Sequence, residues 1–132
     1  MDADGLRLRV LIVDDTPVIR AVVRRILERD GRFEVVGEAC DGLEAVDMTE
    51  GLQPDLVLLD LAMPRMDGLQ ALPEIITNAP SVTVVVLSSF SRDQMKDAAL
   101  DAGALGYVEK DRIAITLVPQ IVSVCTSLLL DA

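Results

Sequence analysis

The chain has 132 residues, of which 51% are hydrophobic and 26% are charged, and its formal net charge is −10. This composition is too apolar for a disordered chain and too charged for a bundle of membrane helices. The acidic excess argues against a broad contact with nucleic acid, because binding a phosphate backbone requires clustered lysine and arginine. We therefore expect one domain over residues 1–132, with a core of about 7–130, that contacts neither nucleic acid nor a membrane.

Cysteine and histidine usage excludes several kinds of site. The chain has no histidine, and its two cysteines, Cys40 and Cys125, lie far apart in the sequence and form no C-x-x-C motif. This arrangement indicates neither a zinc site nor a disulfide framework, and reduced core thiols in a cytoplasmic protein are the plain interpretation. The acidic N-terminus also lacks the basic start of a secretory signal.

The first half of the chain alternates apolar runs with helical patterns. The apolar run Leu8–Val13 predicts a strand, and Thr16-Pro17 predicts a helix start, because proline suits the first helical position. Gly31 is expected to end this helix. The next predicted elements are a strand over Phe33–Gly37, a short helix over about Leu43–Glu50 and a strand over Leu56–Leu59.

The second half continues the alternation. A third helix is expected over Leu69–Ile76, although Pro73 should weaken or bend it. The unbroken run Val82–Leu87 suits a strand covered on both faces, and Ser91–Gln94 reads as a capping box that opens a fourth helix. A short strand through Tyr107 and Val108 follows, and then the uncharged segment Ile113–Leu130, whose polar positions fall largely on one side, as in an amphipathic packing helix rather than a membrane span.

Five strand–helix units in succession predict a single doubly wound α/β domain, with a parallel sheet and helices on both faces. In such sheets ligands bind beyond the carboxyl ends of the strands. The polar residues that follow the predicted strands are Asp14 and Asp15 after the first, Asp60 after the third, Ser88 and Ser89 after the fourth, and Lys110 after the fifth.

These groups together suit one kind of chemistry. Three neighbouring carboxylates repel one another unless a cation intervenes, and oxygen ligands without histidine or cysteine favour Mg²⁺ or a similar divalent cation such as Mn²⁺. A carboxylate can also attack a phosphoryl group and form an acyl phosphate, while an ammonium and a hydroxyl bind the phosphoryl oxygens. The strand ends therefore predict a magnesium-dependent phosphoryl site.

The same residues resemble the receiver domains of two-component response regulators. The acidic pair Asp14-Asp15 and the segment Asp60–Gly68, which fits D-x-x-M-P-x-M-D-G, resemble two of the family's motifs. Val85–Ser88 resembles the strand that ends in the switch Ser/Thr, and Gly106–Lys110 resembles the aromatic-plus-lysine motif. The resemblance covers nearly the whole chain and implies a flavodoxin-like sheet with strand order 2-1-3-4-5.

The resemblance also implies a role for each residue. The chain would be a signalling switch that catalyses its own phosphorylation and dephosphorylation, and not a metabolic enzyme. Its donor would be a sensor histidine kinase or a phosphotransfer protein, and its output or homodimer surface would be the face formed by the fourth helix, fifth strand and fifth helix. The implied roles are phosphoacceptor for Asp60, metal ligands for Asp14, Asp15, Asp60 and the Ala62 carbonyl, phosphoryl contact for Lys110, and switch residues for Ser88 and Tyr107.

Three features depart from the family pattern or restrict what the resemblance implies. Asp111 follows Lys110 where most relatives have proline, so we expect a trans peptide there, and this variant resembles receivers linked to helix-turn-helix DNA-binding outputs. Ala62 and Phe90 occupy positions that tune phosphoryl lifetime in the family. Only 22 residues follow Lys110, which leaves room for one helix and no output domain, as in a stand-alone receiver or an excerpt of a longer regulator.

Two alternatives belong to other functional classes. A degenerate receiver would keep the fold and act as an interaction module without phosphorylation, although every chemical position is filled. An aspartyl phosphatase or phosphomutase usually presents two aspartates two positions apart after its first strand, and Asp14-Asp15-Thr16 does not fit that spacing.

Overall fold

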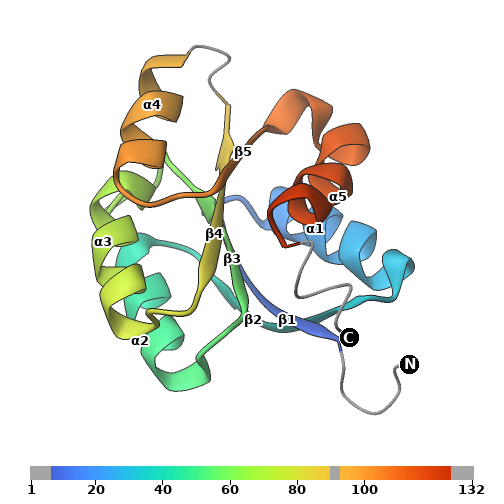
Figure 1. Ribbon diagram of the computed structural model, residues 1–132, viewed down its shortest axis with the longest axis horizontal. Helices are drawn as coiled ribbons and strands as arrows, with labels where there is room; N and C mark the ends of the chain where they lie inside the picture. Colours follow the sequence, from blue (N-terminus) through green and yellow to red (C-terminus); the bar gives the residue numbers. More distant parts are fainter. Residues whose placement is uncertain (1–6, 90–92, 126–132) are drawn as a thin grey trace.

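The computed structural model describes residues 7–89 and 93–125, and it contains a five-stranded parallel sheet in the order β2-β1-β3-β4-β5 (Figure 1). This confirms the predicted fold class and strand order. The elements are β1 Leu8–Val13, α1 Pro17–Asp30, β2 Phe33–Ala39, α2 Gly42–Leu52, β3 Leu56–Asp60, α3 Gly68–Asn78, β4 Thr83–Ser88, α4 Asp93–Asp101, β5 Gly106–Glu109, the 3₁₀ turn Lys110–Arg112 and α5 Ile113–Val124.

The helices cover both faces of the sheet, with α1 and α5 on one side and α2, α3 and α4 on the other (Figure 1). Each face has its own aliphatic core, and one ring, that of Phe33, belongs to the core under α1 and α5. All residues of the central strands β3 and β4 are buried, as the continuous apolar runs predict for strands covered on both faces. The carboxyl ends of all five strands consequently lie at one edge of the sheet.

Local signals placed most helix ends correctly. Helix α1 begins at Pro17 and ends at Asp30, and the capping residue Gly31 adopts a left-handed conformation (φ 89°). Helix α3 runs through Pro73 and begins with a capping box between Asp67 and Gln70 that the sequence analysis missed. The capping box predicted at Ser91–Gln94 lies outside the residues whose side chains are described, as does Phe90.

The last helix corrects one expectation. The residues predicted to form the apolar side of an amphipathic helix include Ala114, but Ala114 is exposed. The buried positions are Ile113, Leu117 and Ile121, followed at the same spacing by Cys125 just after the helix. The part of the predicted helix beyond residue 125 lies outside the described residues. Among the helices that are described, none has the length and apolarity to cross a membrane.

Neither cysteine is in a disulfide, as expected. Cys125 is buried in the core, but Cys40 is half-buried just after β2, so the expectation of two core thiols is correct for only one of them. The Lys110–Asp111 peptide is trans, as predicted, because the part of the chain that is described contains no cis peptide bond.

Candidate functional site

Three of the predicted site residues are in direct contact. Asp14 follows β1, Asp60 ends the neighbouring strand β3, and Lys110 follows the edge strand β5. The ammonium Nζ of Lys110 lies 2.6 Å from Oδ2 of Asp14 and 3.1 Å from Oδ1 of Asp60. Both carboxylates are buried and the lysine side chain is 12% exposed, so the parallel sheet gathers these charges at one largely dry edge.

The buried carboxylate of Asp60 is only partly satisfied. Its Oδ1 accepts a hydrogen bond from the amide of Ala62 at 3.2 Å and pairs with Lys110. Its Oδ2 has no hydrogen-bond partner among the described residues. Burial and the nearby charge of Asp14 raise the pKa of Asp60 from 3.8 to about 6, against the opposing effect of Lys110.

Lys110 balances the two carboxylates. Burial lowers the pKa of Lys110, but its contacts with Asp14 and Asp60 outweigh burial, and the pKa lies above the ordinary value of 10.5. The side chain therefore stays charged at neutral pH. One positive charge faces two negative ones, and a further cation would be attracted to the same place.

The third carboxylate, that of Asp15, completes a donor set suited to a metal. Oxygen atoms of Asp14, Asp15 and Asp60 all lie within 4.8 Å of one another, and Asp15 is exposed to solvent, from which an ion could enter. The set contains only carboxylate oxygens, which favour Mg²⁺ over metals that prefer nitrogen or sulfur. The buried Oδ2 of Asp60, for which the described part of the chain offers no hydrogen-bond partner, also fits a bound cation.

The two predicted switch residues lie on the adjoining strands. Ser88 is the buried last residue of β4 and faces Glu109 in the register with β5. Tyr107 pairs with Val86 and is half-buried, and it lines a pocket of ≈ 230 Å³ with residues of α4 and α5. Tyr107 therefore belongs to the surface made by α4, β5 and α5, while Ser88 lies at the end of β4, opposite the residue that precedes Lys110.

The loop after Asp60 is held closely against its surroundings. A Cβ added to Gly68 would lie 2.0 Å from the Asp60 carbonyl oxygen, so only glycine allows α3 to start this close to β3. The carbonyl of Met66 accepts a hydrogen bond from Gly42 at the start of α2, at 2.9 Å. Arg65, in the left-handed conformation (φ 66°), forms an ion pair with the buried Asp41.

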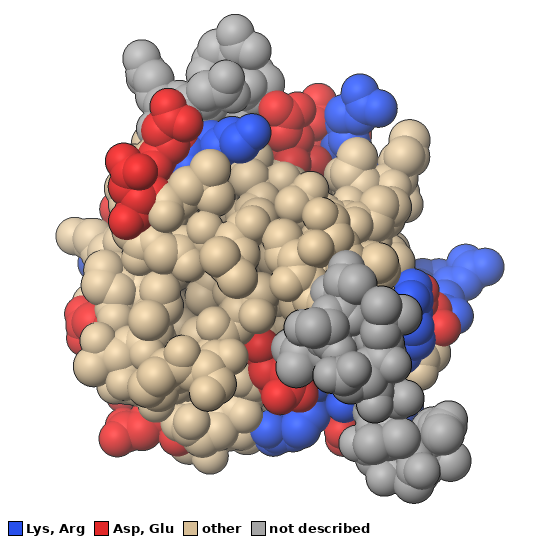
Figure 2. Space-filling model, in the orientation of Figure 1, with Lys and Arg blue, Asp and Glu red and all other residues tan. Residues whose placement is uncertain are grey.

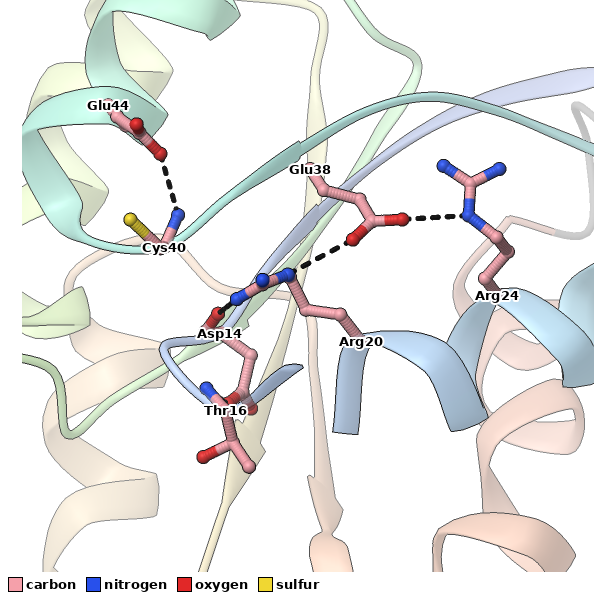
Figure 3. A network of polar contacts seen from close by, with 7 residues as sticks. All are labelled: Asp14, Thr16, Arg20, Arg24, Glu38, Cys40 and Glu44. Carbon is pink, nitrogen blue, oxygen red and sulfur yellow. Dashed lines mark hydrogen bonds and ion pairs between the residues drawn. The ribbon is translucent and has the colours of Figure 1, made fainter. Parts of the chain in front are cut away.

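Several residues around the site escaped the sequence analysis. Asp41 precedes Gly42 as a helix cap and accepts from the Glu44 amide, a local pattern that could have been found. Arg20 of α1 and Glu38 of β2 gave no such signal, yet Arg20 donates to the carbonyl of Asp14 at 2.6 Å and pairs with Glu38 (Figure 3). Such contacts join elements that are distant in the sequence.

Sequence comparison finds relatives for nearly the whole chain. It is 44% identical to protein-glutamate methylesterase/protein-glutamine glutaminase 5 of Geobacter metallireducens over 107 residues, which are 80% of this chain and 30% of that protein. It is 43% identical to the transcriptional regulatory protein PdtaR of Mycobacterium tuberculosis over 123 residues, 91% of this chain and 58% of the relative. The chain thus spans about a third to three fifths of the length of these curated relatives.

Solved structures agree with the sequence relatives. The response regulator domain of Thermotoga maritima CheB superposes with a TM-score of 0.84 at 30% identity, covering 91% of this chain and 97% of that one. A LuxR-family two-component response regulator from Aurantimonas sp. gives a TM-score of 0.86 at 30% identity, covering 92% and 86% of the two chains. The response regulator receiver domain family itself matches residues 10–121. With the acidic cluster, the lysine and the sheet order in their expected places, this chain belongs to the response regulator receiver domain family.

Proposed function

We propose that the chain is a magnesium-dependent phosphorylation switch in which Asp60 accepts the phosphoryl group. The observation that carries this proposal is the state of the Asp60 carboxylate: Oδ1 is held by Lys110 and by the Ala62 amide, while Oδ2 is buried without a hydrogen-bond partner among the described residues. An oxygen with an open lone pair beside a fixed cation is suited to attack a phosphorus atom.

In the proposed reaction Asp60 attacks a phosphohistidine on a sensor histidine kinase or phosphotransfer protein. A bond forms between the carboxylate oxygen and phosphorus, and the phosphorus–nitrogen bond to the donor imidazole breaks. The imidazole keeps the electron pair and takes up a proton from water. Hydrolysis of the acyl phosphate by water then returns the Asp60 carboxylate and inorganic phosphate, so the chain would catalyse both its phosphorylation and its dephosphorylation.

Asp14, Asp15, Asp60 and the backbone carbonyl of Ala62 would hold the Mg²⁺. When bound, this ion supplies positive charge that offsets the phosphoryl oxygens and the repulsion among the carboxylates. Lys110 would contact a phosphoryl oxygen, since its ammonium already lies within 3.1 Å of Asp60.

Ser88 and Tyr107 would transmit the structural effect of phosphorylation to the rest of the domain. Ser88 lies at the end of β4 and Tyr107 on the adjacent β5, so a hydroxyl drawn toward Asp60 would alter the packing around the aromatic ring. Tyr107 lines the pocket between α4, β5 and α5 together with Lys96 and Thr116. This α4-β5-α5 face would then contact a partner, a second copy or an output domain.

We also propose that residues 1–132 form one receiver domain, and that the molecule contacted by its α4-β5-α5 face determines its output. Names of the relatives include both a methylesterase and a transcriptional regulator. The Lys110-Asp111 pair and the LuxR-family structure support control of transcription.

The decisive experiment is incubation of the chain with acetyl phosphate and Mg²⁺, followed by intact-protein mass spectrometry. We expect one phosphoryl group on the wild type and on Asp47→Asn, an exposed control on α2, and none on Asp60→Asn or after chelation of Mg²⁺. Beryllofluoride should perturb the NMR signals of the site in the same two proteins only. Wild-type protein that is neither modified nor perturbed would refute the proposal and favour a degenerate receiver that acts without phosphorylation.

A further inference from the structure

Arg20 lies where helix energetics disfavour it. It is one turn into α1, near the positive end of the helix dipole, and the first turn of α1 contains no acidic residue. The N-cap residue Thr16 makes no side-chain capping bond either. A partly buried cation near this helix start needs another reason to be there, and side chains that break a local rule often serve a site.

The guanidinium of Arg20 connects the acidic loop to the sheet (Figure 3). Its side chain is 19% exposed. One nitrogen, Nη1, donates to the backbone carbonyl of Asp14 at 2.6 Å, and Nε pairs with Glu38 on β2 at 3.0 Å. The fixed fork of an arginine can make both contacts at once, which the point charge of a lysine cannot do in the same geometry.

Glu38 compensates the charge of Arg20. Its second oxygen binds Nε of Arg24, one helical turn further along α1, at 2.7 Å. Glu38 thereby lies between two arginines and neutralises a cation that would otherwise repel a divalent ion in the acidic cluster. Arg24 itself pairs with Glu38 and Glu28.

The carbonyl that Arg20 binds belongs to the peptide between Asp14 and Asp15. Because a peptide unit is planar, holding its oxygen restricts the orientation of the Asp15 backbone. The Asp14 side chain is already fixed, by the Thr16 amide at 2.8 Å and by Lys110 at 2.6 Å. Asp15, by contrast, is exposed, so its placement depends on its backbone.

We infer that Arg20 is a positioning residue for the divalent cation: by holding the carbonyl between Asp14 and Asp15, it fixes Asp15 as a ligand, with Glu38 as its anchor and charge partner. The inference rests on the proposed magnesium site and deepens it. Electrostatics alone gives the opposite expectation, since removing a nearby positive charge should strengthen cation binding. The sign of the change therefore separates the two explanations.

The test is calorimetric titration of Mg²⁺ into the metal-free full chain. Arg20→Ala should weaken binding by about tenfold or more, the usual effect of losing an outer-sphere partner of a metal site. Arg24→Ala is the matched control, because it also removes an ion pair with Glu38 but leaves the Asp14 carbonyl bonded. We expect its affinity to stay within about twofold of wild type, a margin well below the loss typical of outer-sphere partners.

A second readout needs no metal. In EDTA, the Thr16 amide, which donates to Asp14 Oδ1, should exchange its hydrogen faster in Arg20→Ala than in Arg24→Ala. Arg20→Lys should recover part of the Mg²⁺ affinity that Arg20→Ala loses. If Arg20→Ala does not fold, the Mg²⁺ affinity of Arg20→Lys tests the inference in its place. The inference about Arg20 would be overturned, with the proposed function left intact, if the Arg20 variants bound Mg²⁺ as tightly as wild type or more tightly. The same would follow if Arg24→Ala weakened Mg²⁺ binding equally. Wild-type protein that binds no Mg²⁺ would overturn the proposed function and this inference with it.

Discussion

Asp60 is held in an environment that opposes its negative charge. Its side chain is 2% exposed, and burial together with Asp14 places its pKa at about 6 instead of 3.8. The folded protein therefore binds the proton more tightly than the unfolded chain does, and ionisation of Asp60 lowers the free energy of unfolding as the pH rises through this window. A shift of about two pKa units corresponds to about 3 kcal/mol at neutral or higher pH. The proposed reactivity of Asp60 would thus be obtained at the expense of stability.

We predict that Asp60→Asn stabilises the metal-free protein. In EDTA at pH 8 its free energy of unfolding should exceed that of wild type by up to about 3 kcal/mol, because the neutral amide has no charge to bury and is not repelled by Asp14. Below about pH 3, where the carboxyl group is protonated in both the folded and the unfolded chain, the difference should vanish. Urea unfolding monitored by circular dichroism measures both values, with Asp47→Asn as an exposed control. Equal stability at pH 8 would mean that Lys110 fully compensates the charge.

At the scale of elements, the site depends on the close approach of β3 and α3. The amide of Gly68 donates to the carbonyl of Leu61 at 3.0 Å, and the Asp60 carbonyl lies where a Gly68 side chain would be. This packing bends the chain sharply after Asp60. Helix α2 supports the same loop through the hydrogen bond from Gly42 to Met66. The first residues of α2 and α3 therefore both hold the loop that follows Asp60.

Replacement of Gly68 by alanine should consequently destabilise the domain. We expect a loss of about 2 kcal/mol or more, because the clash at 2.0 Å is with backbone and cannot be relieved by a side-chain rotation. Gly51→Ala is the matched control, because Gly51 lies in α2 with open space around it. Alanine at this position should raise the free energy of unfolding by about 0.5–1 kcal/mol. Thermal and urea unfolding of both variants test this pair. A Gly68→Ala variant as stable as wild type would show that the loop tolerates a wider separation.

At the scale of the whole molecule, the net charge of −10 is unevenly distributed. In the view of Figure 2, charged side chains lie mainly around the margin, and the central area over the α3, β4 and β5 region is uncharged. Leu105, which precedes β5, is 57% exposed, and Leu100 of α4 is 38% exposed. Exposed leucines of this kind are suited to a contact with another protein.

We predict that a phosphoryl mimic promotes dimerisation through the α4-β5-α5 face. Sedimentation velocity with beryllofluoride and Mg²⁺ should show a larger dimer fraction than without them, because a change at Tyr107 would alter this surface. Leu105→Asp should abolish the increase, whereas Val18→Asp, on the exposed side of α1, should not. A monomer under both conditions would contradict the prediction.

The sequence by itself determined the order and type of the elements and the residues at the strand ends, because apolar runs, caps and proline positions are local signals. It therefore predicted that Asp14, Asp60 and Lys110 would meet at one edge, which the ion pairs now confirm. Only the tertiary structure decided which oxygen of Asp60 has no hydrogen-bond partner among the described residues. It also decided that Arg20 of α1 holds the Asp14 carbonyl while Glu38 of β2 anchors Arg20. These contacts join residues from different elements, and their geometry depends on how the helices dock on the sheet, which no local pattern encodes.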